Sequence, residues 1–156
     1  MYQKILIPLD GSELAECSLQ HAKAIALGCK AVDVIVIRVV EPLSAQGISA
    51  LVEAGEDFLE KAKMRNQQDA KNYVLEVKSN LNVQGINCQA MTVEGSAAEE
   101  ILNYTEKNNI DLIVMSTHGR SGLSRFLAGS VAEKVSRHSR VPVLLISPYG
   151  CRNFAV

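Results

Sequence analysis

A run of small and polar residues around position 120 has the composition of an anion-binding loop. It follows the apolar segment 112–115 and precedes a helix-like segment, 131–135. Glycines in such a turn let the backbone approach a ligand closely. The first turn of the following helix has unpaired N–H groups and the positive end of the helix dipole, so it stabilises an anion. The pattern therefore predicts a phosphate-binding site. Its candidate residues are Ser116, Thr117, His118, Gly119, Arg120, Ser121, Gly122, Gly129 and Ser130.

A second polar turn, Asp10-Gly11-Ser12, follows the apolar segment 5–9. Asp10 has two open interpretations: it contacts a ligand at the end of a strand, or it only caps the following helix. Ser130 also has two, because Ser130 and Glu133 have the spacing of a capping box, which would serve the helix alone. His118 either contacts the ligand or holds the loop by a side-chain hydrogen bond.

Two better-known phosphate loops are excluded by sequence. A P-loop requires a Lys directly after its last glycine, and Gly129-Ser130 has none. A dinucleotide-binding fingerprint requires three spaced glycines after the first strand, where this chain has only Gly11. The predicted phosphate site is therefore of another kind.

Strand-like and helix-like segments alternate along the whole chain. The strands are expected at 5–9, 32–40, 87–93, 112–115 and 143–146, and the helices at 13–27, 56–82, 96–108 and 131–135. The strands are apolar on both faces, which is typical of a parallel sheet covered by helices on both sides. Ligands of such α/β folds bind beyond the carboxyl ends of the strands, where both polar turns lie.

Two details of the helices can be predicted. Helix 56–82 should bury one side, and the residues expected there are Phe58, Leu59, Ala62, Ala70, Val74, Val77 and Leu81. Helix 96–108 should begin with a capping box, in which Ser96 and Glu99 pair with each other's backbone N–H groups.

Composition narrows the class of protein. A chain of 156 residues with a net charge of −1 fits one globular domain. It has no Trp, few aromatic residues and no dense basic run, which argues against nucleic-acid binding. No segment is long and apolar enough for a membrane span, and the apolar run before Asp10 is too short for a signal peptide. We therefore expect a cytoplasmic protein.

The glycine spacing resembles that of the universal stress protein family, and specifically of its ATP-binding branch. That branch has Gly, two residues, Gly, nine residues, Gly, and then Ser or Thr. Here Gly119 is followed by nine residues and then Gly129-Ser130, while Ser116 stands where the first family glycine falls. The segments 5–10, 39–41 and 142–146 also resemble the family pattern, so the resemblance spans residues 1–147 and leaves 148–156 as a C-terminal tail.

The resemblance implies a single doubly wound, Rossmann-like domain with a five-stranded parallel sheet in the order 3-2-1-4-5. It implies that Pro8, Leu9 and Asp10 lie beside the adenosine, and that the main chain of Val39 meets the adenine edge. The segment 116–122 would wrap the ribose and phosphates. Gly129, Ser130 and Val131 would offer N–H groups to the phosphates.

The implied function is a stress-response regulatory protein that holds ATP and hydrolyses it slowly or not at all. Mg²⁺, or Mn²⁺ in its place, would bind with the nucleotide and contact Asp10. We assign no catalytic residue. The alternative is a nucleotide-free dimeric interaction protein of the same fold. In either case the apolar final strand, Val143–Ile146, should pair two copies into a homodimer, because an exposed apolar edge strand invites pairing. The protein partners stay unspecified.

Overall fold

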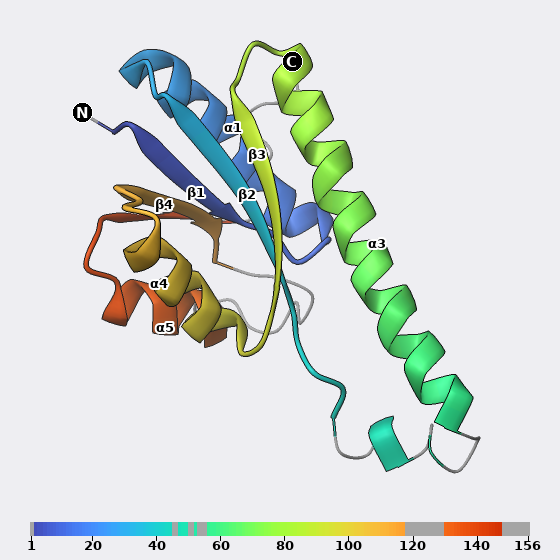
Figure 1. Ribbon diagram of the computed structural model, residues 1–156. Coiled ribbons are helices and arrows are strands. Elements are labelled where there is room, and N and C mark those ends of the chain that lie inside the picture. Colours follow the sequence, from blue (N-terminus) through green and yellow to red (C-terminus); the bar gives the residue numbers. More distant parts are fainter. Residues whose placement is uncertain (1, 45–46, 50–51, 53–55, 118–129, 148–156) are drawn as a thin grey trace.

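A computed structural model describes residues 2–44, 47–49, 52, 56–117 and 130–147 (Figure 1). Its centre is a five-stranded sheet in the order β3-β2-β1-β4-β5, with every neighbouring pair parallel. The predicted fold class and strand order are therefore confirmed. The strands are β1 (Lys4–Pro8), β2 (Asp33–Val40), β3 (Cys88–Glu94), β4 (Leu112–Ser116) and β5 (Val143–Ile146).

Helices cover both faces of this sheet. They are α1 (Glu13–Cys29), α3 (Glu56–Val83), α4 (Ala97–Lys107) and α5 (Ser130–His138). Successive side chains of a strand point to opposite faces, so each strand contributes to two hydrophobic cores. Ile5 and Ile7 of β1 pack with α1 and α3, whereas Leu6 packs with α4 and α5. All three side chains are fully buried. This explains why the strands are continuously apolar.

The strand order reverses beside β1. The chain builds β2 and β3 on one side of β1 and then crosses to place β4 and β5 on the other side. The loops that leave β1 and β4 therefore diverge to opposite faces of the sheet, which opens a crevice at the carboxyl edge between them. Both polar turns singled out in the sequence begin at this edge.

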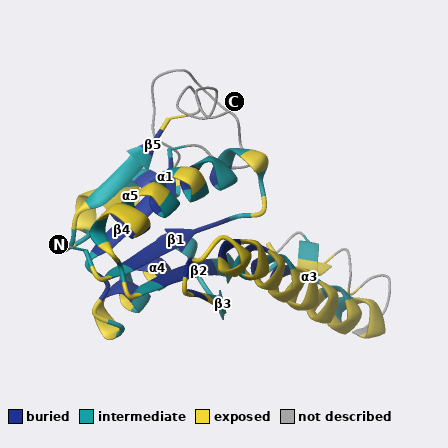
Figure 2. Ribbon diagram, turned by 90° about the horizontal axis from the view of Figure 1, so that it is seen from above, coloured by how far each residue is buried: buried dark blue, intermediate teal, exposed yellow. Residues whose placement is uncertain are grey.

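The long helix α3 departs from the predicted burial. Ala70, Val74, Val77 and Leu81 are buried as expected, but the Phe58 side chain is 59% exposed. Leu59 and Ala62 are only half-buried. The reason is geometric: α3 extends well past the end of the sheet, so its amino-terminal half has no strand beneath it (Figures 1 and 2).

The predicted capping box of α4 is also wrong. Ser96 is the N-cap residue and has the extended backbone of one, yet its side chain makes no capping hydrogen bond. The backbone N–H of Ala97 instead donates to the carboxylate of Glu41, at 3.4 Å, after β2. A carboxylate from another element thus accepts an N–H of the first turn, whereas the Ser96 side chain accepts none.

The strand β5 forms one edge of the sheet. Leu144 packs against the core beneath α1 and α3, and Leu145 against the core beneath α4 and α5. Both side chains remain half-buried, while Ile146 is buried. Among the helices that the structure describes, none has the length and apolar character needed to cross a membrane.

Candidate functional site

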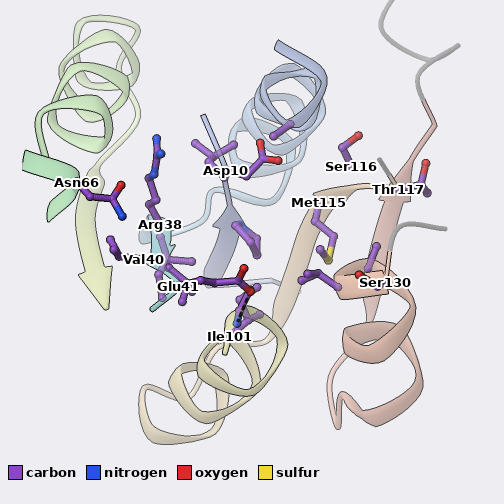
Figure 3. Close-up of a pocket in the computed structure, with 18 residues that line it drawn as sticks. Asp10, Arg38, Val40, Glu41, Asn66, Ile101, Met115, Ser116, Thr117 and Ser130 are labelled. Carbon is purple, nitrogen blue, oxygen red and sulfur yellow. Dashed lines mark hydrogen bonds between the residues drawn. The ribbon is translucent and has the colours of Figure 1, made fainter. Parts of the chain in front are cut away.

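A cavity of about 400 Å³ lies at the carboxyl edge of the sheet, where the strand order reverses (Figure 3). The ends of β1, β2 and β4 form its floor, and the first turns of α4 and α5 and the middle of α3 form its walls. Its volume falls within the range of small-molecule sites, which is about 300–1,000 Å³. The lining residues are Pro8, Leu9, Asp10, Ala15, Ile37, Arg38, Val39, Val40, Glu41, Asn66, Ala97, Ile101, Met115, Ser116, Thr117, Ser130, Val131 and Ala132.

Asp10 is fixed by the turn that follows it. Its Oδ1 atom accepts hydrogen bonds from the backbone N–H of Ser12, at 2.9 Å, and from the Ser12 hydroxyl, at 2.6 Å. The Ser12 Oγ atom accepts a hydrogen bond from the Ala15 N–H, at 3.1 Å, and Ser12 is the N-cap residue of α1. The helix cap is therefore Ser12, and the interpretation of Asp10 as the cap itself is wrong. Asp10 orients the cap and lines the cavity.

The opposite wall of the cavity is built by β4 and α5. Ser116 is buried at the end of β4, where it pairs with Ile146 of β5. The next residue, Thr117, donates its backbone N–H to the Ile146 carbonyl at 2.9 Å. Helix α5 begins at Ser130, and its first two residues face the cavity. This wall presents hydroxyls and a helix N-terminus, the groups that stabilise an anion.

A guanidinium that the sequence analysis did not single out lines the cavity as well. Arg38 lies near the end of β2, and its Cζ atom sits 5.2 Å from the centre of the Tyr73 ring of α3. The Tyr73 hydroxyl donates to a Glu16 carboxylate oxygen of α1 at 2.9 Å. Burial, followed by this hydrogen bond and the Glu16 charge, raises the pKa of Tyr73 far above its usual range. The phenol therefore stays a neutral donor.

Gly11 makes room for this arginine. Its φ is +80°, a conformation that favours glycine. A Cβ atom at Gly11 would overlap the Nη1 atom of Arg38 and lie 3.2 Å from its Cζ. The guanidinium is thus confined between the turn after β1 and an aromatic ring of α3.

Eight of the predicted binding residues line this one cavity: Pro8, Leu9, Asp10, Val39, Ser116, Thr117, Ser130 and Val131. His118, Gly119, Arg120, Ser121, Gly122 and Gly129 lie outside the described residues.

Three polar lining residues were not predicted from the sequence: Arg38 of β2, Glu41 of the segment after it, and Asn66 of α3. A signal existed for Arg38, because it is the one charged residue within the apolar run 34–40. None existed for Asn66, which is one of many polar residues on α3.

The described residues contain no cluster of three or more metal-ligating side chains. Asp10 offers a single carboxylate beside the anion-binding wall. That arrangement suits Mg²⁺ that arrives with phosphates, since Mg²⁺ is commonly held by one or two carboxylates together with phosphate oxygens.

Comparison with known proteins identifies the family. The sequence profile of the universal stress protein family matches residues 1–147. The chain belongs to this family. Universal stress protein MJ0577 of Methanocaldococcus jannaschii is 34% identical over 155 residues, with 94% of this chain and 95% of that protein covered. The solved structure of MJ0577 superposes with a TM-score of 0.79 over 94% of this chain and 96% of its own.

Two more distant universal stress proteins share the fold and were solved with nucleotides. One, in complex with cAMP, has a TM-score of 0.60 at 22% identity and covers 94% of this chain and 98% of its own. The other, from Arabidopsis thaliana with AMP bound, has a TM-score of 0.65 at 13% identity and covers 93% and 91%. At these identities the likeness is one of fold.

Proposed function

We propose that this universal stress protein binds ATP in the cavity at the carboxyl edge of its sheet and acts as a nucleotide-dependent regulatory module. The observation that carries the proposal is the convergence of Asp10, the end of β4 and the N-terminus of α5 on one cavity of nucleotide size. In the sequence, the glycine spacing that resembles the ATP-binding branch falls between Thr117 and Ser130, which both line this cavity. That cAMP and AMP occupy two other proteins of this fold supports a nucleotide as the ligand class.

The proposed orientation follows from the charges around the cavity. The triphosphate lies against the N-terminus of α5, where Ser130 and Val131 begin the helix. The adenine lies over β2 near Val39, among apolar lining residues. The ribose, which joins the two, then lies beside Asp10 at the end of β1.

Slow or absent hydrolysis is part of the proposal. Efficient hydrolysis needs a base that is positioned to activate water. The carboxylates lining the cavity from the described residues are Asp10 and Glu41. The Oδ1 atom of Asp10 is engaged by Ser12, and Glu41 accepts the N–H of Ala97. We therefore assign neither carboxylate the role of a base. Mg²⁺, or Mn²⁺, bound with the phosphates would contribute charge neutralisation and would contact Asp10.

We also propose a homodimer that forms through β5. Leu144 and Leu145 are half-buried at the edge of the sheet, and their side chains lie on opposite faces. A twofold partner that places its own β5 alongside would cover both edges at once, and closed twofold dimers are the commonest soluble assemblies.

The test of nucleotide binding is calorimetric titration with MgATP. Wild type should bind with at least micromolar affinity, equivalent to about 8 kcal/mol. Gly129→Val should weaken binding strongly, because a β-branched side chain would occupy the volume proposed for phosphate. Gly28→Val is the matched control: a Cβ at Gly28 meets nothing within 4 Å, and the residue lies near the end of α1.

Both variants are first checked for folding by circular dichroism. Equal affinities of the wild type and Gly129→Val would refute the phosphate site. Absence of ATP binding by the wild type, together with absence of nucleotide in the mass spectrum of material released from the purified protein, would favour the nucleotide-free interaction protein instead.

A further inference from the structure

Arg38 is the only cationic side chain among the described residues that line the cavity. It does not belong to the anion-binding wall, which is formed by β4 and α5. Figure 3 shows its guanidinium between α3 and Asp10, whereas Ser116, Thr117 and Ser130 lie on the other side of Asp10. The cavity therefore has a polarised helix end on one side of Asp10 and a guanidinium on the other.

The guanidinium is held in place before any ligand arrives. The Tyr73 ring lies 5.2 Å from its Cζ atom, and Tyr73 is itself anchored to Glu16 of α1. The backbone of Gly11 lies against its other side, so closely that a Cβ atom there would overlap Nη1. Gly11 directly follows Asp10, so the guanidinium lies against the same turn that carries the Asp10 carboxylate. A cation fixed in this way loses little conformational entropy when it donates to a ligand.

A carboxylate and a guanidinium that line one cavity suit a neutral group that both donates and accepts hydrogen bonds. A hydroxyl group donates a hydrogen bond to a carboxylate, and its oxygen accepts a hydrogen bond from a guanidinium. A second phosphate would suit this place less well, because the carboxylates of Asp10 and Glu41 also line the cavity and would repel it. The chemistry on this side of the cavity therefore matches a vicinal diol.

We propose that Arg38 is a specificity-determining residue that, together with Asp10, recognises the 2′,3′-diol of a ribonucleotide. The proposal rests on the proposed function, which places the ribose beside Asp10. The Asp10 carboxylate accepts a hydrogen bond from one hydroxyl, and Arg38 donates a hydrogen bond to a hydroxyl oxygen of the same diol. The site then distinguishes ribonucleotides from deoxyribonucleotides, a property that an anion-binding loop alone does not supply.

The experiment compares dissociation constants for ATP, 2′-deoxy-ATP and 3′-deoxy-ATP, each with Mg²⁺, in the wild type and in Arg38→Met. A deoxy analogue lacks one hydroxyl and therefore loses a hydrogen bond to a charged group. The wild type should accordingly bind ATP about tenfold or more tightly than at least one of the two analogues. Arg38→Met keeps a long apolar side chain without the donor, and should reduce that preference to about twofold or less. Arg140→Met is the matched control, because Arg140 is 82% exposed and precedes β5 at the other edge of the sheet.

A second pair of variants tests how the guanidinium is held. Tyr73→Leu removes the ring beneath Arg38 and should narrow the preference for the ribonucleotide, whereas Tyr73→Phe keeps the ring and should retain most of it. Both use the preference among ligands as the readout, so a general loss of stability does not imitate the effect.

The outcomes separate the two proposals. If the wild type binds none of the three nucleotides, the proposed function fails. If the wild type binds ATP and Arg38→Met weakens all three ligands equally, Arg38 acts only as a general positive charge and the proposal is overturned. If Arg38→Met keeps the preference for ATP over the deoxy analogues unchanged, the proposal is overturned as well, because Asp10 would then recognise the diol without Arg38.

Discussion

Replacing Gly11 with Ala should disturb both the fold and the site, and the two effects can be separated. The φ of +80° at Gly11 is unfavourable for an L-residue, at a cost of about 1–2 kcal/mol. The loss of glycine entropy in the unfolded chain offsets about 0.4–1 kcal/mol of this. The new Cβ would also displace Arg38 from the Tyr73 ring, at a cost of about 0.5–1 kcal/mol. We expect a total destabilisation of about 0.5–2.5 kcal/mol from these contributions.

Gly85→Ala is the matched control for this substitution. Gly85 has nearly the same φ, +82°, but a Cβ there meets nothing within 4 Å. It follows the end of α3 at the amino edge of the sheet, away from the cavity. Urea denaturation should therefore give a free energy of unfolding that falls further in Gly11→Ala than in Gly85→Ala, by about 0.5–1 kcal/mol. Calorimetry should show weaker ATP binding only in Gly11→Ala. Equal losses of stability with equal ATP affinities would refute the inferred contact between the β1 turn and Arg38.

Three further outcomes are expected. Mg²⁺ should strengthen ATP binding, and Asp10→Asn should flatten this dependence in titrations with and without the metal; identical metal responses would exclude the proposed contact. Leu144→Lys and Leu145→Lys should each shift the mass measured by light scattering toward the monomer, whereas a monomeric wild type at high micromolar concentration would contradict the β5 dimer. Burial raises the pKa of the Cys88 thiol to about 11, so the folded protein holds the thiol proton more tightly than the unfolded chain does. The resulting contribution to the free energy of unfolding should be complete below about pH 9 and should be lost as the pH rises toward 11. Cys88→Val should lack this loss in urea denaturation at pH 8 and 10.5; parallel pH profiles would disprove the assignment.

The sheet could be predicted from the sequence because its signals are local. Each strand is a short apolar run with turn residues at its end, and burial on both faces leaves no alternation that could suggest another arrangement. Ile5, Leu6 and Ile7 illustrate this, since consecutive residues enter different cores. The polar turn after 5–9 and the one that begins at Ser116 were found for the same reason: they interrupt apolar runs.

The errors involve contacts between distant parts of the chain. Ser96 has the sequence of a cap, but Glu41, more than fifty residues away, accepts the first N–H of α4. Phe58 has helical spacing with the buried residues of α3, but the sheet ends before reaching it. Arg38 lies in a strand that pattern analysis treats as apolar, and its role depends on Gly11 and Tyr73, which only the fold brings together. Periodicity describes one element at a time and does not contain this information.

The reach of α3 beyond the sheet divides that helix into two parts of unequal stability. No residue from Asp57 to Asp69 is buried, whereas Ala70 onward is anchored in the core. The amino-terminal part can therefore unwind without opening the core, and its amides should exchange with solvent by local fluctuation. Asn66, which lines the cavity, belongs to this weakly held part. A ligand that engages Asn66 would favour the helical state of this segment, so its amides should exchange more slowly when the cavity is occupied.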